Sequence, residues 1–239
     1  MRILNGQLVA FLGDSITQHL VAVSDWMETQ TDGLPSVGSA VCVDRHEHRG
    51  WTVMLANRIY LAYPERRITY LNAGIGGDSS RQMLARFDAD ILAHHPHWLL
   101  LSAGVVEVRR NYQPDRVSER VSLEEYMNNL TTMVTKALKA DMQVILLEPT
   151  PHARPVTDGP GAVTLEDVNT LTRQYATAMR QIAQEMGVGF VPLFDAFLRM
   201  EHRLADDTSL YADEVHLNAR GDMLYSQLVY QYLDLPQIP

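Results

Sequence analysis

The sequence predicts an α/β fold in which a parallel β-sheet is covered by helices on both faces. Short apolar runs alternate along the chain with longer segments that carry the periodicity or the capping residues of helices. The apolar runs lack the polar alternation of strands with one exposed face, so we expect them to be buried on both faces, as in parallel sheets. Strands and helices that alternate in this way build a helix-covered sheet. Residues 1–239 are expected to form one domain, because α/β domains often reach this size.

Five apolar runs are the predicted strands. The first ends at Gly13, and the fourth is followed by Pro149 and Pro151, which cannot donate the hydrogen bonds of a continuing strand. A sheet of five parallel strands is therefore expected. The runs cover residues 7–12, 68–71, 98–102, 144–147 and 189–192.

Five helices are predicted between and after these strands. Ser122 and Glu125 fit a capping box, in which a serine and a glutamate three residues later satisfy the first amides of a helix. Gly187 closes the longest helix, and Asn218 is the expected cap of the last one. In the last helix the expected inner stripe is Met223, Leu224, Leu228 and Tyr232. The helices run from Trp51 to residue 62, from Ser79 or Ser80 to about His94, from Ser122 to about Ala140, from Thr164 to Met186, and from about Ala219 to Leu233.

Residues 18–50 are the longest irregular segment. Polar residues, a proline and two glycines break the periodicity there, and a short helix is expected over residues 21–29. Loops of this length in a compact domain are usually functional or disordered. We therefore expect either a lid or wall of a substrate site, or a plain surface excursion. A shorter loop, rich in proline and glycine, is expected over residues 152–163.

Composition and charge argue against several classes of partner. The chain holds 20 Lys and Arg against 29 Asp and Glu, a formal net charge of −9, and it has no long basic run. Nucleic acid and anionic membranes are therefore not expected partners. No segment approaches the ~20 apolar residues of a membrane span. Cys42 is the single cysteine, which rules out an intrachain disulfide, and the first residues lack the features of a signal peptide, so a cytoplasmic location is expected.

The first polar motif, Gly13-Asp14-Ser15, stands where the first strand ends. A serine at this place can direct its hydroxyl out of the sheet edge, and its own amide can face a developing oxyanion. Taken alone, however, an aspartate and a serine after a strand are more typical of a plain helix cap.

A second polar motif, Asp213 with His216, precedes the last predicted helix. A serine is a poor nucleophile until a base removes its proton, and histidine titrates in the useful range. A carboxylate three residues earlier in a turn can reach the Nδ1 edge of the ring, where it fixes the tautomer and stabilises the imidazolium. A surface pair is the alternative interpretation of this spacing.

A glycine-rich segment, Asn72 to Asp78, follows the second strand. Its glycines let the backbone approach a ligand or take positive φ values, so one exposed amide there can bind an oxyanion. A phosphate-binding loop is the competing interpretation, but the segment lacks the GxxxxGK[ST] pattern and has no lysine nearby. Because the motifs follow strands or precede the last helix, we expect them to meet at one edge of the sheet.

The order FLGDSITQ, NAGIGGDS, AGVVEV and DEVHLN along the chain resembles the block pattern of the SGNH, or GDSL, hydrolase family. The resemblance covers essentially the whole chain. It implies a three-layer α/β/α sandwich with a five-stranded parallel sheet of the flavodoxin-like type, and it implies no metal or organic cofactor. The segments VSLEEY and LLEPT look like the bacterial branch that includes arylesterases, thioesterases and carbohydrate O-acetylesterases.

The resemblance also assigns roles to the residues that match the family motifs. Ser15 matches the nucleophile, His216 the general base and Asp213 the acid that orients it. Gly77 matches the glycine whose amide binds the oxyanion together with the amide of Ser15. The partner implied by these roles is a small-molecule ester.

One block departs from the family pattern. Where the family has an asparagine that donates a hydrogen bond to the oxyanion, this chain has Val106, and Glu107 replaces the aspartate that follows. Loss of one such donor costs roughly 10²- to 10³-fold in turnover. Asn111, Arg109 and Arg110 are candidate substitutes from a rearranged loop. The candidate substrate contacts are Asp14, Gly104 and Glu107.

The sequence therefore predicts a serine ester hydrolase for small or short-chain acyl esters, with O-acetyl groups on carbohydrate as one candidate, and with a weakened oxyanion hole. The alternative, motivated by Val106, is a ligand-binding or scaffold protein that kept the triad but lost turnover. Histidines at 46–48 and 94–97 lack the second cluster that a metal site needs, so solvated histidines are expected there.

Overall fold

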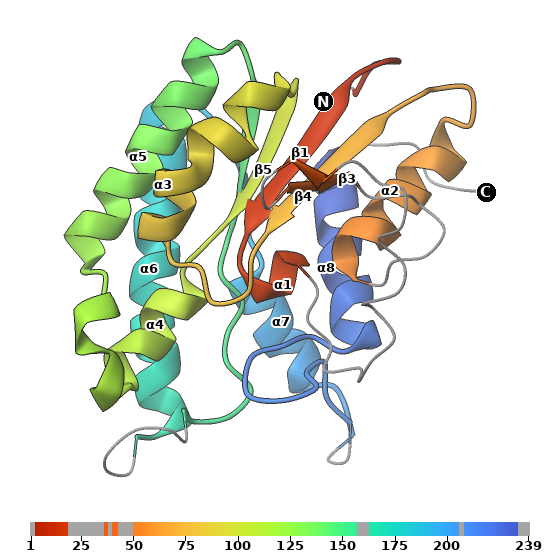
Figure 1. The fold of residues 1–239 in the computed structure, drawn as a ribbon. Coiled ribbons are helices and arrows are strands. Elements are labelled where there is room, and N and C mark those ends of the chain that lie inside the picture. Colours follow the sequence, from red (N-terminus) through yellow and green to blue (C-terminus); the bar gives the residue numbers. More distant parts are fainter. Residues whose placement is uncertain are drawn as a thin grey trace.

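A computed structural model describes residues 3–18, 36–37, 40–42, 50–156, 163–205 and 208–233. Within these ranges the chain forms a seven-stranded sheet in the order β2-β3-β4-β1-β5-β6-β7, with helices on both of its faces (Figure 1). The helix expected over residues 21–29, the histidines at 46 and 48, and residues 157–162 of the proline-rich loop lie outside the described residues.

Five parallel strands form most of the sheet. β1 pairs with β4 on one side and with β5 on the other, and β6 and β7 follow β5. The five predicted strands are confirmed, although the second extends to Gly74 rather than ending at Leu71. Their bounds are Leu8–Gly13 for β1, Thr69–Gly74 for β4, Trp98–Ser102 for β5, Gln143–Leu147 for β6 and Gly189–Val191 for β7.

Two short strands, β2 (Ser36–Val37) and β3 (Ala40–Cys42), extend the sheet beyond β4. They pair antiparallel with each other, and β3 pairs antiparallel with β4. The sequence does not predict them, because runs of two or three residues are too short to show the period of a strand. The five parallel strands are thus the greater part of a larger mixed sheet.

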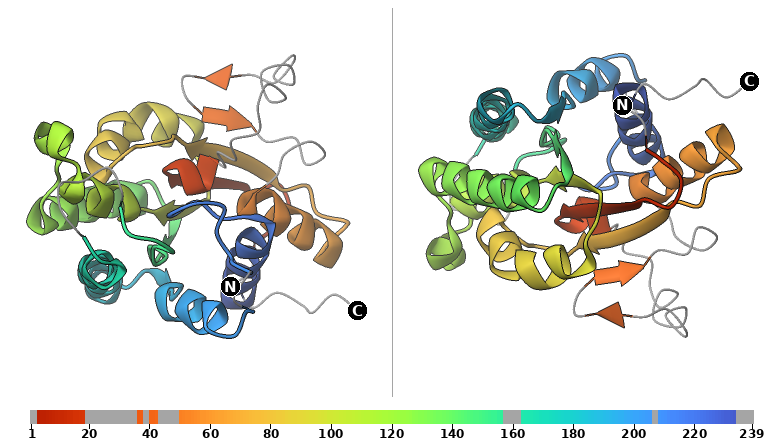
Figure 2. Two further views of the ribbon diagram at one scale, coloured as in Figure 1. Left: turned by 90° about the horizontal axis from the view of Figure 1, so that it is seen from below. Right: turned by 90° about the horizontal axis from the view of Figure 1, so that it is seen from above.

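Helices cover the two faces of the sheet in separate layers, as the end views show (Figure 2). On one face α3 (Ser80–Asp90) packs on α5 (Leu123–Lys139), which packs on α6 (Leu165–Met186). On the other face α2 (Trp51–Ala62) packs on α8 (Ala219–Tyr232). The predicted three-layer α/β/α sandwich is confirmed. Of the described helices, none is long and apolar enough to cross a membrane.

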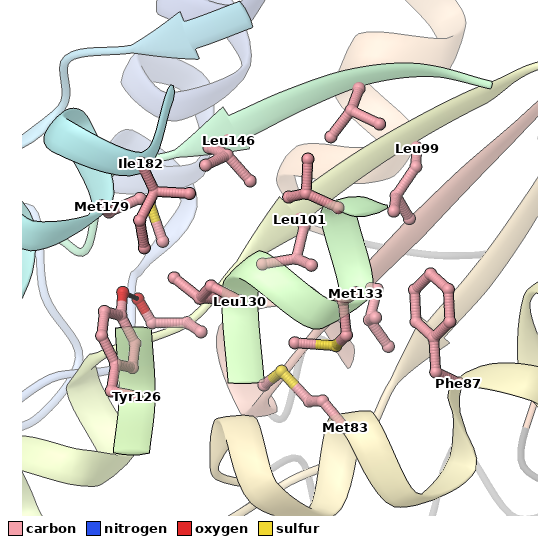
Figure 3. Close-up of a cluster of buried hydrophobic side chains, with 14 of the residues drawn as sticks. Met83, Phe87, Leu99, Leu101, Tyr126, Leu130, Met133, Leu146, Met179 and Ile182 are labelled. Carbon is pink, nitrogen blue, oxygen red and sulfur yellow. Dashed lines mark hydrogen bonds between the residues drawn. The ribbon is translucent and has the colours of Figure 1, made fainter. Parts of the chain in front are cut away.

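Two hydrophobic cores hold these layers together, one on each face of the sheet. In β1, Leu12 belongs to the first core and Phe11 to the second, because successive side chains of a strand point to opposite faces. In the second core the Trp51 ring stacks on that of Tyr225, with centroids 4.5 Å apart. The first core is drawn in Figure 3 and includes Met83 and Phe87 from α3, Leu130 and Met133 from α5, and Leu99 and Leu101 from β5.

The predicted helices agree with the observed ones to within a few residues, except near His94. The helix that starts after Ser79 ends at Asp90, and a separate turn of 3-10 helix, η1 (Leu92–His94), completes the predicted length. Three further segments are not predicted, because one or two turns sample the helical period poorly. They are α4 (Val105–Tyr112), the 3-10 segment η2 (Pro114–Glu119) and α7 (Phe194–Glu201).

The inner stripe predicted for the last helix is wrong at Met223, which is 56% exposed. The other three side chains of that stripe are partly buried and pack against the second core, but they are not the most deeply buried residues of the helix. The buried face of α8 instead contains Tyr225, Val229 and the polar Asp222. Oδ1 of Asp222 accepts a hydrogen bond from the amide of Trp51 at 3.2 Å, at the start of α2. A pattern of apolar residues alone does not predict a buried face that includes such a polar side chain.

Candidate active site

Ser15 lies at the carboxyl end of β1, where the short helix α1 (Ser15–Gln18) begins (Figure 1). Asp14 shapes this turn, because its Oδ1 accepts a hydrogen bond from the Ile16 amide at 2.9 Å. The carbonyl of Asp14 also accepts from the amides of Thr17 and Gln18. These bonds hold the Ser15 hydroxyl at the edge of the sheet.

Asp213 and His216 lie in a narrow loop that precedes α8. Tyr211 and Leu217 form an isolated antiparallel bridge across the base of this loop. Asn218 closes it on both sides: its Nδ2 donates to the carbonyl of Tyr211 at 3.2 Å, and its Oδ1 accepts from the first amides of α8. The loop is therefore fixed to the start of α8, and we call residues 209–218 the triad loop.

The three predicted triad side chains lie together, although the first and the last are 201 positions apart in the chain. His216 Nε2 lies 2.8 Å from Ser15 Oγ, and His216 Nδ1 lies 2.6 Å from Asp213 Oδ2. The other oxygen of Asp213, Oδ1, accepts the amides of Val215 and His216 at 2.9 and 2.8 Å. This arrangement provides a hydroxyl, a base beside its proton, and a carboxylate that orients the base.

The pKa of Asp213 suits a carboxylate that orients the base. Partial burial acts to raise its pKa, but the hydrogen bonds from Val215 and His216 outweigh burial and hold the pKa below its usual value. The carboxylate is therefore ionised at neutral pH. An ionised partner at Nδ1 keeps the proton of a neutral imidazole on Nδ1, which leaves Nε2 free to accept the proton of Ser15.

The glycine-rich loop after β4 lies against α1. The Ile75 amide donates to the Gly13 carbonyl at 3.0 Å, and the Gly76 amide donates to Oε1 of Gln18 at 2.6 Å. Gly77 follows with a φ of 81°, a conformation that disfavours a side chain. In the part of the chain that the structure describes, the amides of Gly77 and Ser15 donate to no protein acceptor. Within the described residues, no protein acceptor therefore competes for the two predicted oxyanion donors.

Val106 lies in the first turn of helix α4, so the prediction of a loop at this block is wrong. The helix begins directly after Gly104, which has a φ of 128°. A Cβ atom on Gly104 would lie 3.0 Å from Cγ of Pro149, so the strand end packs too closely for a side chain. Val106 is 8% exposed and belongs to the same apolar cluster as Ile16 and Val215, which flank Ser15 and His216 in sequence. That Val106 replaces the family asparagine stays a prediction.

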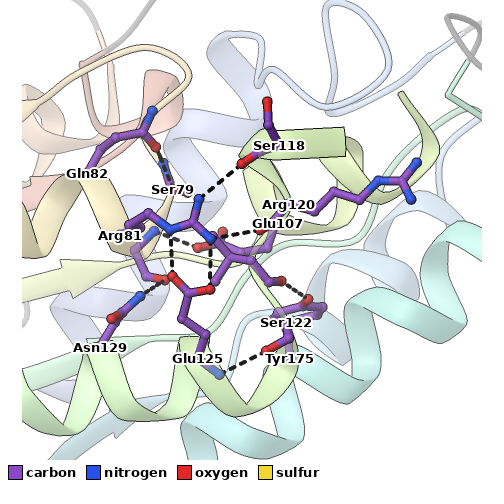
Figure 4. A network of polar contacts seen from close by, with 12 residues as sticks. Ser79, Arg81, Gln82, Glu107, Ser118, Arg120, Ser122, Glu125, Asn129 and Tyr175 are labelled. Carbon is purple, nitrogen blue, oxygen red and sulfur yellow. Dashed lines mark hydrogen bonds and ion pairs between the residues drawn. The ribbon is translucent and has the colours of Figure 1, made fainter. Parts of the chain in front are cut away.

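Glu107 joins helices rather than facing the triad. Its side chain is fully buried, and Oε1 accepts the amide of Ser80 at 2.6 Å at the start of α3. From α5, Asn129 donates to the Ser80 hydroxyl at 3.2 Å, and Glu125 accepts two hydrogen bonds from Arg81 (Figure 4). Burial raises the pKa of Glu107, against the bonds from Ser80 that lower it. A substrate cannot reach this carboxylate unless the helices move apart.

Asp14 is also buried, with 1% of its surface exposed. Burial raises its pKa to about 7; the Ile16 amide opposes this shift, and the charges of Glu107 and Asp78 add to it. Gly104 is buried as well. All three predicted substrate contacts, Asp14, Gly104 and Glu107, are therefore buried, and the prediction that they bind substrate is wrong: Asp14 holds the turn at Ser15, and Glu107 joins α4 to α3.

Residues 151–153, after β6, support the triad loop, a role that the sequence does not reveal. The Ala153 amide donates to the Glu214 carbonyl at 2.8 Å, and the Tyr211 hydroxyl donates to the Pro151 carbonyl at 2.7 Å. The side chain of Asn169 on α6 bonds both the amide and the carbonyl of His152. The only sequence signal for this role is the cluster of prolines where β6 ends.

Two further side chains lie beside the triad loop: His152, for which the sequence predicts no role, and Arg109, which the sequence suggests only as a substitute oxyanion donor. His152 is 3% exposed, and burial together with the positive charge of Arg109 lowers its pKa to about 4, although Asp213 acts in the opposite direction. His152 is therefore neutral at pH 7. Arg109 itself links α4 to the triad loop, because its Nη2 lies 3.9 Å from Oε2 of Glu214.

Among the described residues, no group of three or more His, Cys, Asp or Glu side chains could hold a metal ion. Of the histidines at 94–97, His97 has a structural contact: its Nδ1 accepts the amide of Leu8 at 3.2 Å. This bond ties the start of β5 to the start of β1.

Known proteins resemble this chain over nearly its whole length. The model of the GDSL-like lipase/acylhydrolase family matches residues 11–224. An acetylxylan esterase of Geobacillus stearothermophilus is 27% identical over 228 residues, 95% of this chain and 94% of that protein. The human isoamyl acetate-hydrolyzing esterase 1 homolog is 25% identical over 202 residues, 80% of this chain and 77% of that protein. Among solved structures, a variant of an acetyl-xylooligosaccharide esterase from Geobacillus has a TM-score of 0.78 at 26% identity and covers 99% of this chain and 98% of its own.

Proposed function

The chain belongs to the GDSL-like lipase/acylhydrolase family, and from this premise we propose that it cleaves small acyl esters through an acyl-enzyme on Ser15. Family membership and the esterase relatives identify a carboxylic ester hydrolase. The observation that carries the detailed mechanism is the continuous hydrogen-bonded row Ser15–His216–Asp213, with 2.8 and 2.6 Å between successive side chains.

In the first half of the reaction, Ser15 Oγ attacks the carbonyl carbon of the ester while its proton moves to His216 Nε2. The carbonyl oxygen becomes an oxyanion that faces the amides of Ser15 and Gly77. The bond from carbon to the alcohol oxygen then breaks, and His216 returns the proton to the leaving alcohol. The acyl group remains on Ser15 as an ester.

In the second half, His216 takes a proton from water, and the resulting hydroxide oxygen attacks the acyl carbon on Ser15. The bond between that carbon and Ser15 Oγ breaks as His216 gives the proton back to Oγ. The products are a carboxylic acid and free enzyme. Through both halves, Asp213 holds the ring orientation and stabilises the imidazolium.

Acetyl is the acyl group that we propose, and an O-acetyl group on a carbohydrate is the proposed substrate class. Support comes from the relatives that match most of this chain, whose names refer to acetylxylan and to isoamyl acetate. The low exposure of Val106, Ile16 and Val215, which belong to one hydrophobic core, also favours a small acyl group over a long one.

The test measures hydrolysis of p-nitrophenyl acetate, butyrate and octanoate, and acetate release from acetylated xylo-oligosaccharides. We expect turnover that is highest for acetate and falls with chain length. In Ser15→Ala turnover should disappear, whereas Thr177→Ala, which removes an exposed hydroxyl on α6, should match the wild type.

The alternative, a ligand-binding protein that kept the triad without turnover, is favoured by the apolar Val106. It predicts no turnover and no burst of p-nitrophenol with any of the three esters. Turnover that depends on Ser15 excludes it. Hydrolysis that survives Ser15→Ala contradicts the proposed mechanism.

A further inference from the structure

Helix α4 presents one row of side chains to the site. Because successive residues of an α-helix are about 100° apart, Arg109, Val106 and Arg110 are neighbours on one face, with Val106 between the two arginines. At one end of the row, Arg109 lies 3.9 Å from Glu214 of the triad loop. At the other end, Arg110 lies beside Gly77, since a Cβ atom on that glycine would be 3.6 Å from Arg110 Nη2. The row therefore extends from the triad loop to the glycine-rich loop after β4, residues 75–78, which we call the oxyanion loop.

The Arg110 guanidinium is held in this place by two other groups. Its Nε lies 3.1 Å from Oε2 of Glu119, and its Nη1 donates to Oε1 of Gln113 at 2.7 Å. Only 12% of its side chain is exposed. These contacts occupy two of the three nitrogens and turn the third, Nη2, towards Gly77. A cation fixed in this way loses little conformational freedom when it binds an anion.

From this geometry we propose that Arg110 donates a hydrogen bond from Nη2 to the oxyanion of the transition state, together with the amides of Ser15 and Gly77. The inference rests on the proposed function. Helical side chains lean towards the helix N-terminus, so Arg110 extends back over the turn that holds Val106. Valine offers no donor, and the arginine one turn later supplies a charged one, which binds an oxyanion more strongly than a neutral amide does.

The other two side chains of α4 that are candidates to replace the missing asparagine donor contact other groups. Arg109 faces Glu214 and lies close enough to His152 to affect its pKa, at the opposite end of the row from Gly77. The side chain of Asn111 donates to the Glu107 carbonyl at 2.9 Å. Arg110 is the one of the three whose guanidinium lies against the oxyanion loop.

The first experiment compares Arg110→Met with Arg116→Met on p-nitrophenyl acetate. Arg116 is the matched control, because it also pairs with Glu119, at 3.3 Å, but it is more exposed. We expect Arg110→Met to lower kcat about 10²-fold with little change in KM, the signature of a donor that acts in the transition state. Arg116→Met should match the wild type, and Arg110→Lys should retain part of the activity.

A second variant distinguishes a lost oxyanion donor from a weakened fold in Arg110→Met. Adding Val106→Asn to Arg110→Met places a neutral donor one turn away, so it should restore much of the lost kcat. The gain should be larger than the gain from Val106→Asn in the wild-type background. Equal gains in both backgrounds, or an unchanged kcat in Arg110→Met, overturn the inference.

A labelling experiment separates this inference from the proposed function. An alkyl fluorophosphonate reacts with an activated serine, its phosphoryl oxygen occupies the oxyanion site, and the added mass on Ser15 is followed by mass spectrometry. We expect labelling to be about tenfold or more slower in Arg110→Met. If Ser15 is labelled but no ester is hydrolysed, the proposed function fails, and the labelling rates still decide the role of Arg110. Absence of labelling in the wild type overturns both.

Discussion

The two sides of the candidate site differ in how their polar groups are held. On the α8 side, both oxygens of Asp213 accept hydrogen bonds from within the triad loop, and the ring of His216 is fixed between Asp213 and Ser15. On the α4 side, Val106 offers no donor, and the charged group that lies against Gly77 comes from Arg110 one turn later. The groups that we propose for proton transfer and the arginine that we propose as an oxyanion donor thus lie on separate elements, the triad loop and α4. A change on one element can leave the other intact.

The carboxylates around the site also differ in the direction in which their pKa values are shifted. Hydrogen bonds lower the pKa of Asp213, whereas burial raises the pKa values of Asp14 and Glu107. The triad loop is therefore built to keep a charge, whereas the turn before Ser15 and helix α4 hold carboxylates whose ionisation is unfavourable. The four predictions that follow test this contrast, from the largest expected effect to the smallest.

The largest effect is expected from Asp213→Asn, which tests the α8 side. The asparagine oxygen can still accept the amides of Val215 and His216, so the loop keeps its shape. The side-chain amide then faces Nδ1 and stabilises the wrong tautomer of the ring. We expect kcat on p-nitrophenyl acetate to fall about 10³- to 10⁴-fold. A loss of less than about tenfold would show that Asp213 does not set the tautomer.

The attachment of the triad loop is tested by Gly221→Ala. A Cβ atom on Gly221 would lie 2.3 Å from the Leu210 carbonyl, so the loop has to move. A displacement of about 1 Å in catalytic groups can cost 10²-fold, and we expect kcat to fall by about that factor. Gly187→Ala is the control, because it strains a left-handed residue at the end of α6 without any neighbour near the new atom. It should lower Tm but leave kcat unchanged; equal losses of kcat in both variants would contradict the prediction.

The α4 side is tested by Val106→Asn. If Val106 occupies the family asparagine position, the new side chain adds a donor to the oxyanion, and we expect kcat to rise at least about tenfold. Steady-state kinetics on p-nitrophenyl acetate provide the measurement, with thermal unfolding as a check on the fold. Unchanged or lower turnover in a folded variant would count against the alignment of this block.

The smallest effect concerns stability and pH. The pKa of Asp14 is about 7 in the folded chain, against an ordinary value of 3.8, so the folded state binds more protons between these values. Stability is therefore expected to fall as pH rises from about 4 to about 7. Asp14→Asn keeps an acceptor for the Ile16 amide and removes the charge, so it should flatten this slope and gain ~1–3 kcal/mol at pH 8. Urea unfolding at several pH values measures both quantities, and a slope equal to that of the wild type would refute the prediction.

Much of the fold could be predicted because its signals are local. Each of the five parallel strands is a short apolar run, and several of the long helices carry their own capping residue, as Ser122 and Asn218 illustrate. The failures are equally physical. α4 and α7 are too short to show a helical period, and the two residues of β2 cannot show alternation. The buried face of α8 includes Asp222, whose burial is stabilised by a bond to Trp51, 171 positions away in the chain.

The same division applies to the site. The motifs at Ser15, Gly77, Asp213 and His216 are recognisable because residue type and strand context are encoded within a few positions. The burial of Asp14 and Glu107 is not, since burial depends on the packing of elements far apart in the chain, as the bond that joins Glu107 of α4 to the Ser80 amide of α3 illustrates. Both residues looked like substrate contacts in the sequence and are supports in the structure.

The order of amino acids alone therefore specifies the parallel sheet, the long helices and the residue types of the proposed nucleophile, base and acid, because these depend on short-range periodicity and on motifs a few residues long. The packing of the chain decides which groups share a space: that His216 reaches Ser15 across 201 positions, that Glu107 points into the protein, and that Arg110 rather than Arg109 lies against Gly77. The physical reason is that such distances depend on how helices stack on the sheet, and no local pattern contains them.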